Sequence, residues 1–303
     1  MKVDDSVVDL RISVLPTVYG EKIVMRILDR NNFLKTKEEL GFTQDNMEKF
    51  NSLLEVPNGI ILAAGPTGSG KTTTLYAALY ELNKLNRNIV TIEDPVEYKI
   101  EGINQVQVNT KAGLLFSTGL RSILRQDPNI IMVGEIRDEE TAEIAVRAAI
   151  TGHMVISTIH TNDAVSTIMR LRDMGIKPYL VAASLRGIVA QRLVKKVCLN
   201  CKEGYEASEA EKKLLEIKGN LILYKGKGCP KCYYTGYSGR RAIHEILKID
   251  KAIRDAIQNE KGNDEIELLA ERSGMKNLKD NCRDLVLSGI TTMEEYIQVV
   301  YKM

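Results

Sequence analysis

The stretch Gly65-Pro66-Thr67-Gly68-Ser69-Gly70-Lys71-Thr72 matches the phosphate-binding pattern G-x-x-x-x-G-K-[ST]. Residues 59 to 64 precede it as an apolar run that is too short for a helix, which predicts a buried parallel strand. After it, apolar residues recur at helical spacing between positions 75 and 82. The stretch therefore predicts a strand, a loop and a helix in succession, and these flanks disfavour a glycine-rich turn that binds nothing.

Each residue type in this loop suits a bound triphosphate. The glycines let backbone N–H groups curl around phosphate oxygens, Lys71 neutralises charge on the β and γ phosphates, and Thr72 can bind Mg²⁺. We therefore predict a nucleoside triphosphate site. Its predicted contacts are Gly65, Pro66, Thr67, Gly68, Ser69, Gly70, Lys71, Thr72 and Thr73.

The composition is that of an ordinary globular chain. The 303 residues leave room for two domains, and 44% are hydrophobic. The 42 basic and 40 acidic residues give a formal net charge of +2, so no overall field would attract nucleic acid. No signal sequence or membrane span is visible, and we expect a cytoplasmic protein that at most docks on a membrane.

The chain divides into five predicted segments. Residues 7 to 28 alternate apolar and polar around positions 16 to 21, which predicts an antiparallel hairpin with a loop of several residues. Because two strands alone are marginal, we interpret residues 1–30 as the end of an N-terminal domain. We expect a polar linker over 31–42, a core that carries the nucleotide site over 43–194, a cysteine-rich subdomain over 195–241 and a helical subdomain over 242–303.

The core alternates strands and helices. We expect strands at residues 59–64, 89–92, 130–133 and 154–159, between helices that begin near residues 43, 71, 114, 139 and 164. This rhythm predicts an α/β fold with a doubly wound, mainly parallel sheet.

Two acids end predicted strands of this sheet, where a triphosphate needs a metal ligand and a group that positions water. Glu135 follows the strand at 130–133 in a Walker B pattern and is expected to hold Mg²⁺ through water; the alternative is a cap on the next helix. Glu93 ends the strand at 89–92, and we expect it to polarise the attacking water. The alternative is a solvated acid before the turn at Pro95.

Two C-x-x-C pairs, separated by 27 residues, have the spacing of a four-thiolate zinc site. Four thiolates leave no open position for water, so the predicted zinc is structural. The fifth cysteine, Cys282, lies between leucines of a predicted helix and is expected in the core. The predicted zinc ligands are Cys198, Cys201, Cys229 and Cys232.

Together these motifs resemble the secretion ATPase superfamily, specifically the type II secretion and type IV pilus assembly motors. The matching stretches are GPTGSGKTTTLYAAL, TIEDPVEY, LRQDPNIIMVGEIRD, TGHMVISTIHTNDA and the paired cysteines, spread over residues 8 to 250. One departure is Asn129, where the family usually has Asp. The resemblance implies a RecA-type fold, Mg²⁺-dependent ATP hydrolysis, a homo-hexamer and an inner-membrane platform protein as partner.

The resemblance also assigns roles to basic residues. His160 would report the γ-phosphate, whereas His153 has a structural alternative and His244, outside every motif, is interpreted as structural. The similar motors gather arginines at the nucleotide cleft or the subunit interface; for each, a surface salt bridge is the alternative. The matching arginines are Arg11, Arg26, Arg121, Arg125 and Arg137.

The sequence thus favours a cytoplasmic, ring-forming ATPase that drives assembly of a pilus or a secretion pseudopilus. The cysteine pairs favour the assembly motors over the retraction motors, which resemble this chain but lack the tetracysteine insert. A nucleic-acid translocase or loader of RecA type is the alternative, and the balanced charge disfavours it. A nucleotide-gated scaffold without hydrolysis is disfavoured by Lys71, Glu93 and Glu135.

Overall fold

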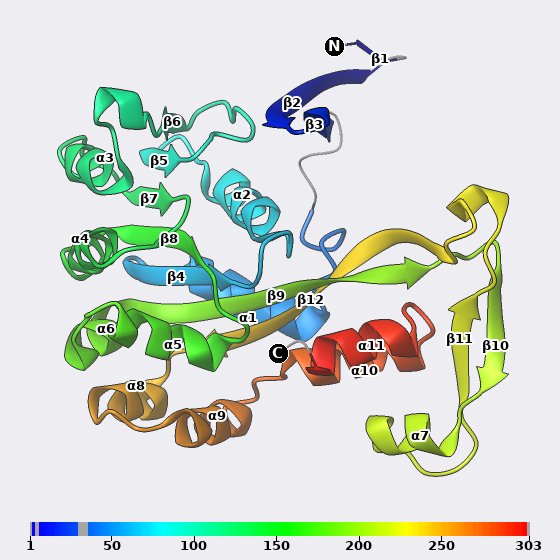
Figure 1. The fold of residues 1–303 in the computed structure, drawn as a ribbon. Helices are drawn as coiled ribbons and strands as arrows, with labels where there is room; N and C mark the ends of the chain where they lie inside the picture. Colours follow the sequence, from blue (N-terminus) through cyan, green and yellow to red (C-terminus); the bar gives the residue numbers. More distant parts are fainter. Residues whose placement is uncertain (1, 4–5, 30–35, 302–303) are drawn as a thin grey trace.

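The computed structural model describes residues 2–3, 6–29 and 36–301. A seven-stranded sheet forms the centre of the protein, and Figure 1 shows the helices and other strands around it. The strand order is β12-β9-β4-β8-β7-β5-β6, and every neighbouring pair is parallel except β12 with β9. The strands are β4 (Gly59–Ala64), β5 (Ile89–Glu93), β6 (Asn104–Gln107), β7 (Ile130–Val133), β8 (Met154–Ile159), β9 (Leu185–Val197) and β12 (Tyr237–Lys248).

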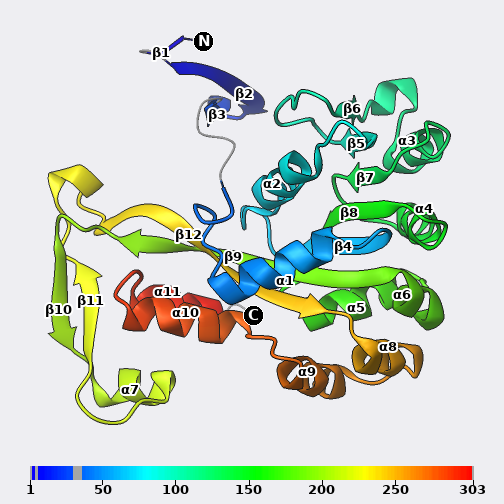
Figure 2. The same cartoon turned by 180° about the vertical axis from the view of Figure 1, so that it is seen from behind.

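Helices cover both faces of this sheet, and two hydrophobic clusters fill the space beneath them. One face carries α1 (Gln44–Leu54) and α2 (Lys71–Leu82), which lie in front of the sheet in Figure 2. The opposite face carries α3 (Phe116–Ile123), α4 (Glu139–Ile150), α5 (Ala164–Asp173) and α6 (Pro178–Ser184). The doubly wound α/β class predicted from the sequence is confirmed.

The junction of β4 and α2 shows why the glycines are needed. All six residues of β4 are buried, so the strand fixes the loop that follows it. Gly65, Gly68 and Gly70 have φ angles of 146°, 79° and 90°, a region that side chains disfavour. A Cβ on Gly65 would lie 2.4 Å from the carbonyl oxygen of Gln191, so that position also has no room for one.

Two long strands carry the cysteine-rich region away from the core. The 13 residues of β9 and the 12 of β12 pair antiparallel and project beyond the other strands (Figure 1). Their far ends hold β10 (Lys202–Glu206), α7 (Glu209–Leu215), β11 (Ile222–Gly226) and the short 3₁₀ turn η2 (Pro230–Cys232).

Neither long strand was expected from the sequence. The predicted boundaries at 195 and 242 fall within β9 and β12, so residues 242–248, assigned to a helical subdomain, instead form a strand of the main sheet. Buried polar residues interrupt the apolar pattern of these strands, which hides them. They are Gln191, Arg192, His244 and Glu245.

Helices close the C-terminal part from residue 251 onward, as predicted. They are α8 (Lys251–Gln258), α9 (Asn263–Arg272), α10 (Leu278–Leu287) and α11 (Met293–Tyr301). Glu245 of β12 joins two helices to the sheet: its carboxylate accepts hydrogen bonds from the backbone N–H groups of Ala164 and Leu278, at 2.8 and 3.1 Å. Among the described helices, none is long and apolar enough to cross a membrane.

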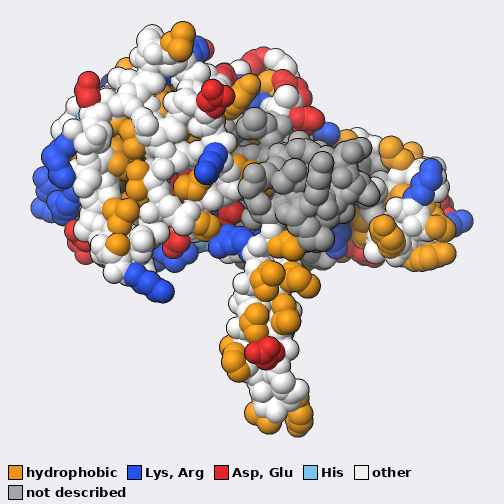
Figure 3. Space-filling model, turned by 90° about the horizontal axis from the view of Figure 1, so that it is seen from above, with side chains coloured by type: hydrophobic (Ala, Val, Ile, Leu, Met, Phe, Trp, Pro, Cys, Tyr) orange, Lys and Arg blue, Asp and Glu red, His pale blue; other side chains and the backbone are white. Residues whose placement is uncertain are grey.

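The N-terminal strands form an arm. β2 (Ser6–Thr17) and β3 (Gly20–Asp29) pair antiparallel, with β1 (Lys2–Val3) on β2. The predicted loop of several residues is wrong, because Thr17 pairs with Gly20 and only residues 18 and 19 form the turn. Gly20, at a φ of 120°, makes this tight turn possible. Figure 3 shows the arm projecting from the body with hydrophobic side chains exposed along it.

The predicted linker, 31–42, is described only from residue 36. In that part Leu40 and Phe42 are buried, so the chain already packs against the core before α1 begins. Residues 31 to 35 of the predicted linker lie outside the described residues.

Candidate nucleotide-binding site

A cavity of about 460 Å³ opens at the carboxyl ends of β4, β5, β7 and β8. In parallel sheets this edge is the usual place for a ligand. The cavity brings together groups that are far apart in the sequence. Among its lining residues are Thr67, Gly68, Ser69, Gly70, Lys71, Thr72, Thr73, Glu93, Glu97, Gly134, Glu135, Thr158 and His160.

Lys71 lies at the base of the phosphate loop, where its side chain is largely buried. Its Nζ donates hydrogen bonds to the carbonyl oxygens of Gly65, at 2.6 Å, and Pro66, at 3.0 Å. Burial lowers the pKa of Lys71 to about 8, against an opposing effect of the Glu135 carboxylate. A bound phosphate would offer the ammonium group a stronger acceptor than two carbonyl oxygens.

The loop has the features that a triphosphate requires. The hydroxyl oxygen of Ser69 is buried and has no hydrogen-bond partner among the described residues. Gly70 precedes the first turn of α2, where free N–H groups and the helix dipole favour an anion. The residues present therefore fit phosphate groups, and the Thr72 hydroxyl follows Lys71 where the motif places a Mg²⁺ ligand.

Glu135, Arg137 and His160 meet at one side of the cavity. The Oε2 atom of Glu135 lies 2.6 Å from Nε of Arg137 and 3.6 Å from Nε2 of His160. Burial is the largest cause that lowers the pKa of His160, and the nearby cations of Lys71 and Arg137 lower it further, against Glu135. The imidazole is therefore neutral at physiological pH and has one N–H to donate. The sequence predicted all three residues for this site.

Glu93 lines the same cavity from the end of β5 but is only 3% exposed. Its Oε1 accepts hydrogen bonds from the hydroxyl of Thr91, at 2.6 Å, and from Nε2 of Gln105, at 3.2 Å. The hydroxyl of Tyr76 donates to its Oε2. The carboxylate is thus held in one orientation, so the solvated alternative for Glu93 is wrong.

The other predicted arginines lie in two places. Arg11, on the N-terminal arm, reaches Glu97 of the cavity, with 3.5 Å between Nη1 and Oε1. Arg26 faces Arg11 across the β2–β3 pair and is exposed. Arg121 instead pairs with exposed Glu140 of α4, at 3.1 Å.

Arg125 also lies away from the cavity, because its guanidinium donates to the carbonyl oxygen of Arg121 and to the hydroxyl of Ser122. Neither Arg121 nor Arg125 lines the cavity. The role of these two arginines at a subunit interface stays a prediction.

The two other histidines lie outside the cavity. His153 precedes β8 at its opposite end, and its Nδ1 lies 3.0 Å from the carbonyl oxygen of Ala148. His244 is 1% exposed and stacks on Phe42, with 3.8 Å between ring centroids. Burial lowers the pKa of His244 to about 3, so it is neutral. Both have structural surroundings.

Gln191 of β9 secures the phosphate loop, although no sequence motif points to it. It is 1% exposed, accepts a hydrogen bond from the hydroxyl of Thr74 at 2.6 Å and donates to the carbonyl oxygen of Ser69 at 2.9 Å. An amide in the middle of the apolar run at 188–194 was the signal available in the sequence.

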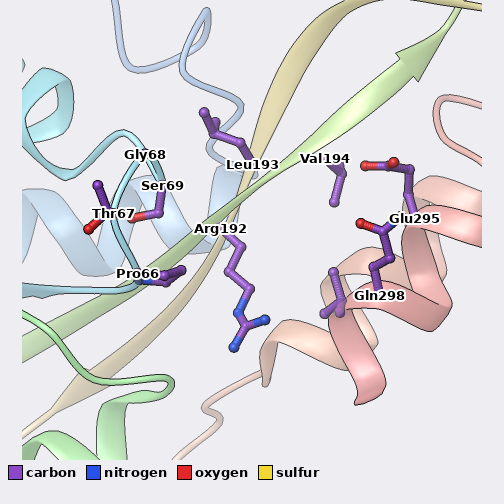
Figure 4. Close-up of a pocket in the computed structure, with 10 residues that line it drawn as sticks. Pro66, Thr67, Gly68, Ser69, Arg192, Leu193, Val194, Glu295 and Gln298 are labelled. Carbon is purple, nitrogen blue, oxygen red and sulfur yellow. The ribbon is translucent and has the colours of Figure 1, made fainter. Parts of the chain in front are cut away.

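A smaller cavity, of about 180 Å³, lies between the phosphate loop and α11. Figure 4 shows Arg192 of β9 between Pro66 and Ser69 on one side and Glu295 and Gln298 on the other. The phosphate loop therefore faces Glu93 and Glu135 on one side and the last helix on the other.

The four predicted cysteine ligands lie together at the end of the β9–β12 pair. Their sulfur atoms all lie within 4.8 Å of one another, and three of the separations are 3.7, 3.9 and 3.9 Å. A tetrahedron with Zn–S bonds of about 2.3 Å requires sulfur atoms roughly 3.8 Å apart. The residues present fit a zinc ion. Cys282 is separate and buried in α10.

Known proteins resemble this chain in sequence and in fold. The family described as "Type II/IV secretion system protein" matches residues 1–298. The type II secretion system ATPase E of Vibrio cholerae is 50% identical over 301 residues, which are 99% of this chain and 60% of that protein. The type IV pilus assembly ATPase PilB of Thermus thermophilus is 51% identical over 295 residues, 96% of this chain and 33% of that protein.

Solved structures of secretion and pilus ATPases have a similar fold. The crystal structure of the pilus retraction motor PilT with bound ADP matches with a TM-score of 0.70 and 28% identity, covering 96% of this chain and 73% of that one. The Legionella pneumophila ATPase DotB shares the fold, with a TM-score of 0.71 at 22% identity over 98% of this chain and 73% of that one. The chain spans 60% of the length of the Vibrio cholerae secretion ATPase and 33% of the length of the Thermus thermophilus PilB. It belongs to the type II/IV secretion system protein family.

Proposed function

We propose that this protein binds ATP with Mg²⁺ and hydrolyses the bond between its β and γ phosphates. The observation that carries the proposal is that Lys71, at the start of α2, lines one cavity together with Glu93 and Glu135, which lie at the carboxyl ends of β5 and β7. Binding alone would require the loop, whereas the two carboxylates add what hydrolysis requires.

Each group has a task in this reaction. Lys71 and the N–H groups of the loop hold the phosphates, and Glu93 orients the attacking water and accepts its proton. Thr72 and Glu135 would hold Mg²⁺, which when bound neutralises charge on the transferring phosphoryl group. His160, which lines the cavity, would donate a hydrogen bond to the γ-phosphate, and Arg137, which contacts Glu135, would add positive charge beside it.

Hydrolysis would drive the assembly of a type IV pilus or of a type II secretion pseudopilus. The names of the relatives support this role, because one is a secretion ATPase and another a pilus assembly ATPase. Working in the cytoplasm as a homo-hexamer, the protein would dock on an inner-membrane platform protein. Within such a ring, Arg121 and Arg125 would face a neighbouring subunit, and Arg11 and Arg26 would close over the nucleotide.

The cysteine tetrad would hold one structural Zn²⁺. The support is that the four sulfur atoms lie at separations close to those of a tetrahedral zinc site, and that they come in two C-x-x-C pairs. Zinc with four thiolates contributes to folding and takes no part in hydrolysis.

Phosphate release from ATP in the presence of Mg²⁺ tests the proposed reaction. Wild-type protein should release phosphate, and Lys71→Ala should not, because the loop loses the charge that holds the β and γ phosphates. Lys84→Ala is the matched control, since Lys84 is exposed just beyond α2. Equal rates for Lys71→Ala and wild type would contradict the proposal.

A further inference from the structure

Tyr76 connects the helix of the phosphate loop to the carboxylate of Glu93. It lies in α2, five positions after Lys71, and is 1% exposed. Its hydroxyl donates to Oε2 of Glu93 and accepts a hydrogen bond from the backbone N–H of Glu97, at 3.3 Å. A tyrosine that served only to fill the core would not need a hydroxyl with both partners inside the protein.

The hydroxyl acts on the one carboxylate oxygen that the other donors leave alone. Thr91 and Gln105 both donate to Oε1 of Glu93, which occupies its two acceptor positions. Tyr76 takes one position on Oε2. Among the described residues no second donor lies on Oε2, so one lone pair there is available for a water molecule.

The proton stays on the tyrosine. Burial, together with the hydrogen bond and the charge of Glu93, raises the pKa of Tyr76 far above the physiological range. The hydroxyl is therefore a permanent donor to the carboxylate, and it cannot replace Glu93 as the acceptor of a proton.

The same hydroxyl reaches the segment that follows β5. The backbone N–H of Glu97 donates a hydrogen bond to this hydroxyl, and Glu97 lines the cavity and contacts Arg11 of the N-terminal arm. Tyr76 thus joins three parts of the site: the phosphate-loop helix, the end of β5 and the segment in contact with the arm. A shift of any one changes where Oε2 of Glu93 can lie.

We propose that Tyr76 is a positioning residue for hydrolysis: its hydroxyl turns Oε2 of Glu93 toward the attacking water and keeps it in register with the phosphates held by Lys71. The inference rests on the role proposed for Glu93. It predicts that loss of the hydroxyl reduces the chemical step and leaves nucleotide binding intact, because Tyr76 lies beneath the carboxylate and does not line the cavity.

The test is Tyr76→Phe, which keeps the ring and removes one oxygen. We expect kcat for ATP to fall roughly ten- to a hundredfold, as for a misplacement of about 1 Å, with KM and nucleotide affinity within about twofold of wild type. Tyr80→Phe is the matched control, since Tyr80 lies one turn further along α2 and is 62% exposed. Tyr80→Phe should leave kcat unchanged.

A double variant separates positioning from a structural role. If Tyr76 acts through Glu93, the variant Tyr76→Phe with Glu93→Gln should be no slower than Glu93→Gln alone. Gln105→Ala, at a half-buried position, removes another donor from the same carboxylate and should also lower kcat with KM unchanged. This variant keeps the inference testable if Tyr76→Phe does not fold.

The outcomes are distinct. If Glu93→Gln is inactive while Tyr76→Phe and Gln105→Ala hydrolyse ATP like wild type, the inference is overturned and the proposed function stands. If the fold-losses in kcat of Tyr76→Phe and Glu93→Gln multiply in the double variant, Tyr76 acts independently of Glu93 and the inference is also overturned. If Glu93→Gln hydrolyses ATP like wild type, the role proposed for Glu93 fails first.

Discussion

His160 and Glu135 extend from the ends of the neighbouring strands β8 and β7, and Nε2 of the histidine lies 3.6 Å from Oε2 of the glutamate. Arg137 contacts the same oxygen atom. Because Nε2 of an imidazole carries at most one hydrogen, it can donate either to Glu135 or to a phosphate oxygen, but not to both at full strength. The pair is therefore suited to report whether a γ-phosphate is present.

His160→Ala should lower kcat about tenfold or more while nucleotide affinity changes little, because the loop that binds the phosphates stays intact. His153→Ala is the matched control: it removes a contact with Ala148 at the opposite end of the same strand and should affect stability more than kcat. Steady-state kinetics and thermal unfolding of both variants are the measurements. Equal effects on kcat would contradict the role of His160.

Nucleotide binding should depend on pH through Lys71. The lysine is charged below its pKa of about 8 and neutral above it, so the affinity for ATP is full below pH 8 and falls as the pH rises through this value, by up to about tenfold per unit. Bound phosphate raises the pKa, which places the loss above pH 8. Titrations with ATP between pH 7 and 10 measure it. Lys71→Ala should bind weakly and lack this slope, and an unchanged slope would exclude Lys71 as its source.

The cysteine tetrad should bind about one zinc per chain. Cys201→Ser and Cys232→Ser should each lose the metal and make residues 195–241 sensitive to protease, because zinc contributes roughly 10–16 kcal/mol of apparent binding free energy in comparable sites. Cys282→Ser, in α10, should retain the metal. A wild-type protein without metal, and with this segment equally resistant to protease, would contradict the assignment.

Gln191→Leu should weaken the phosphate loop. The substitution leaves the carbonyl oxygen of Ser69 and the hydroxyl of Thr74 buried without their partner, and each such group costs about 1–3 kcal/mol. We expect a lower free energy of unfolding in urea and a raised KM for ATP. Gln258→Leu, at the exposed end of α8, is the control and should change neither the free energy of unfolding nor KM. A Gln191→Leu variant as stable as wild type would show that the amide is dispensable.

Much of the sheet could be predicted from the sequence because its central strands are short apolar runs between turn signals. Residues 59–64, 130–133 and 154–159 form strands where they were expected, and each is entirely buried. The phosphate loop and the two acids follow from their places at the ends of such strands. The local sequence pattern is sufficient to predict a strand where helices cover both of its faces.

The rest depends on contacts that are distant in the sequence. The strands β9 and β12 contain buried polar residues whose partners lie elsewhere, such as Gln191 with Ser69 and Glu245 with Ala164, and no local pattern predicts them. Tyr76 was part of a recognised motif, but its contact with Glu93 appears only in three dimensions. The hairpin turn is shorter than the sequence predicts, because Pro16 continues the strand and pairs with Glu21.

The most direct test of the account compares Glu135→Gln with wild type in two measurements on the same samples: ATP affinity and the rate of phosphate release. Glu140→Gln, in the first turn of α4 and exposed, is the control. The account predicts that Glu135→Gln binds ATP with nearly wild-type affinity and releases phosphate at least about a hundredfold more slowly, because it loses a group needed in the transition state. A Glu135→Gln protein that hydrolyses ATP at the wild-type rate would contradict it.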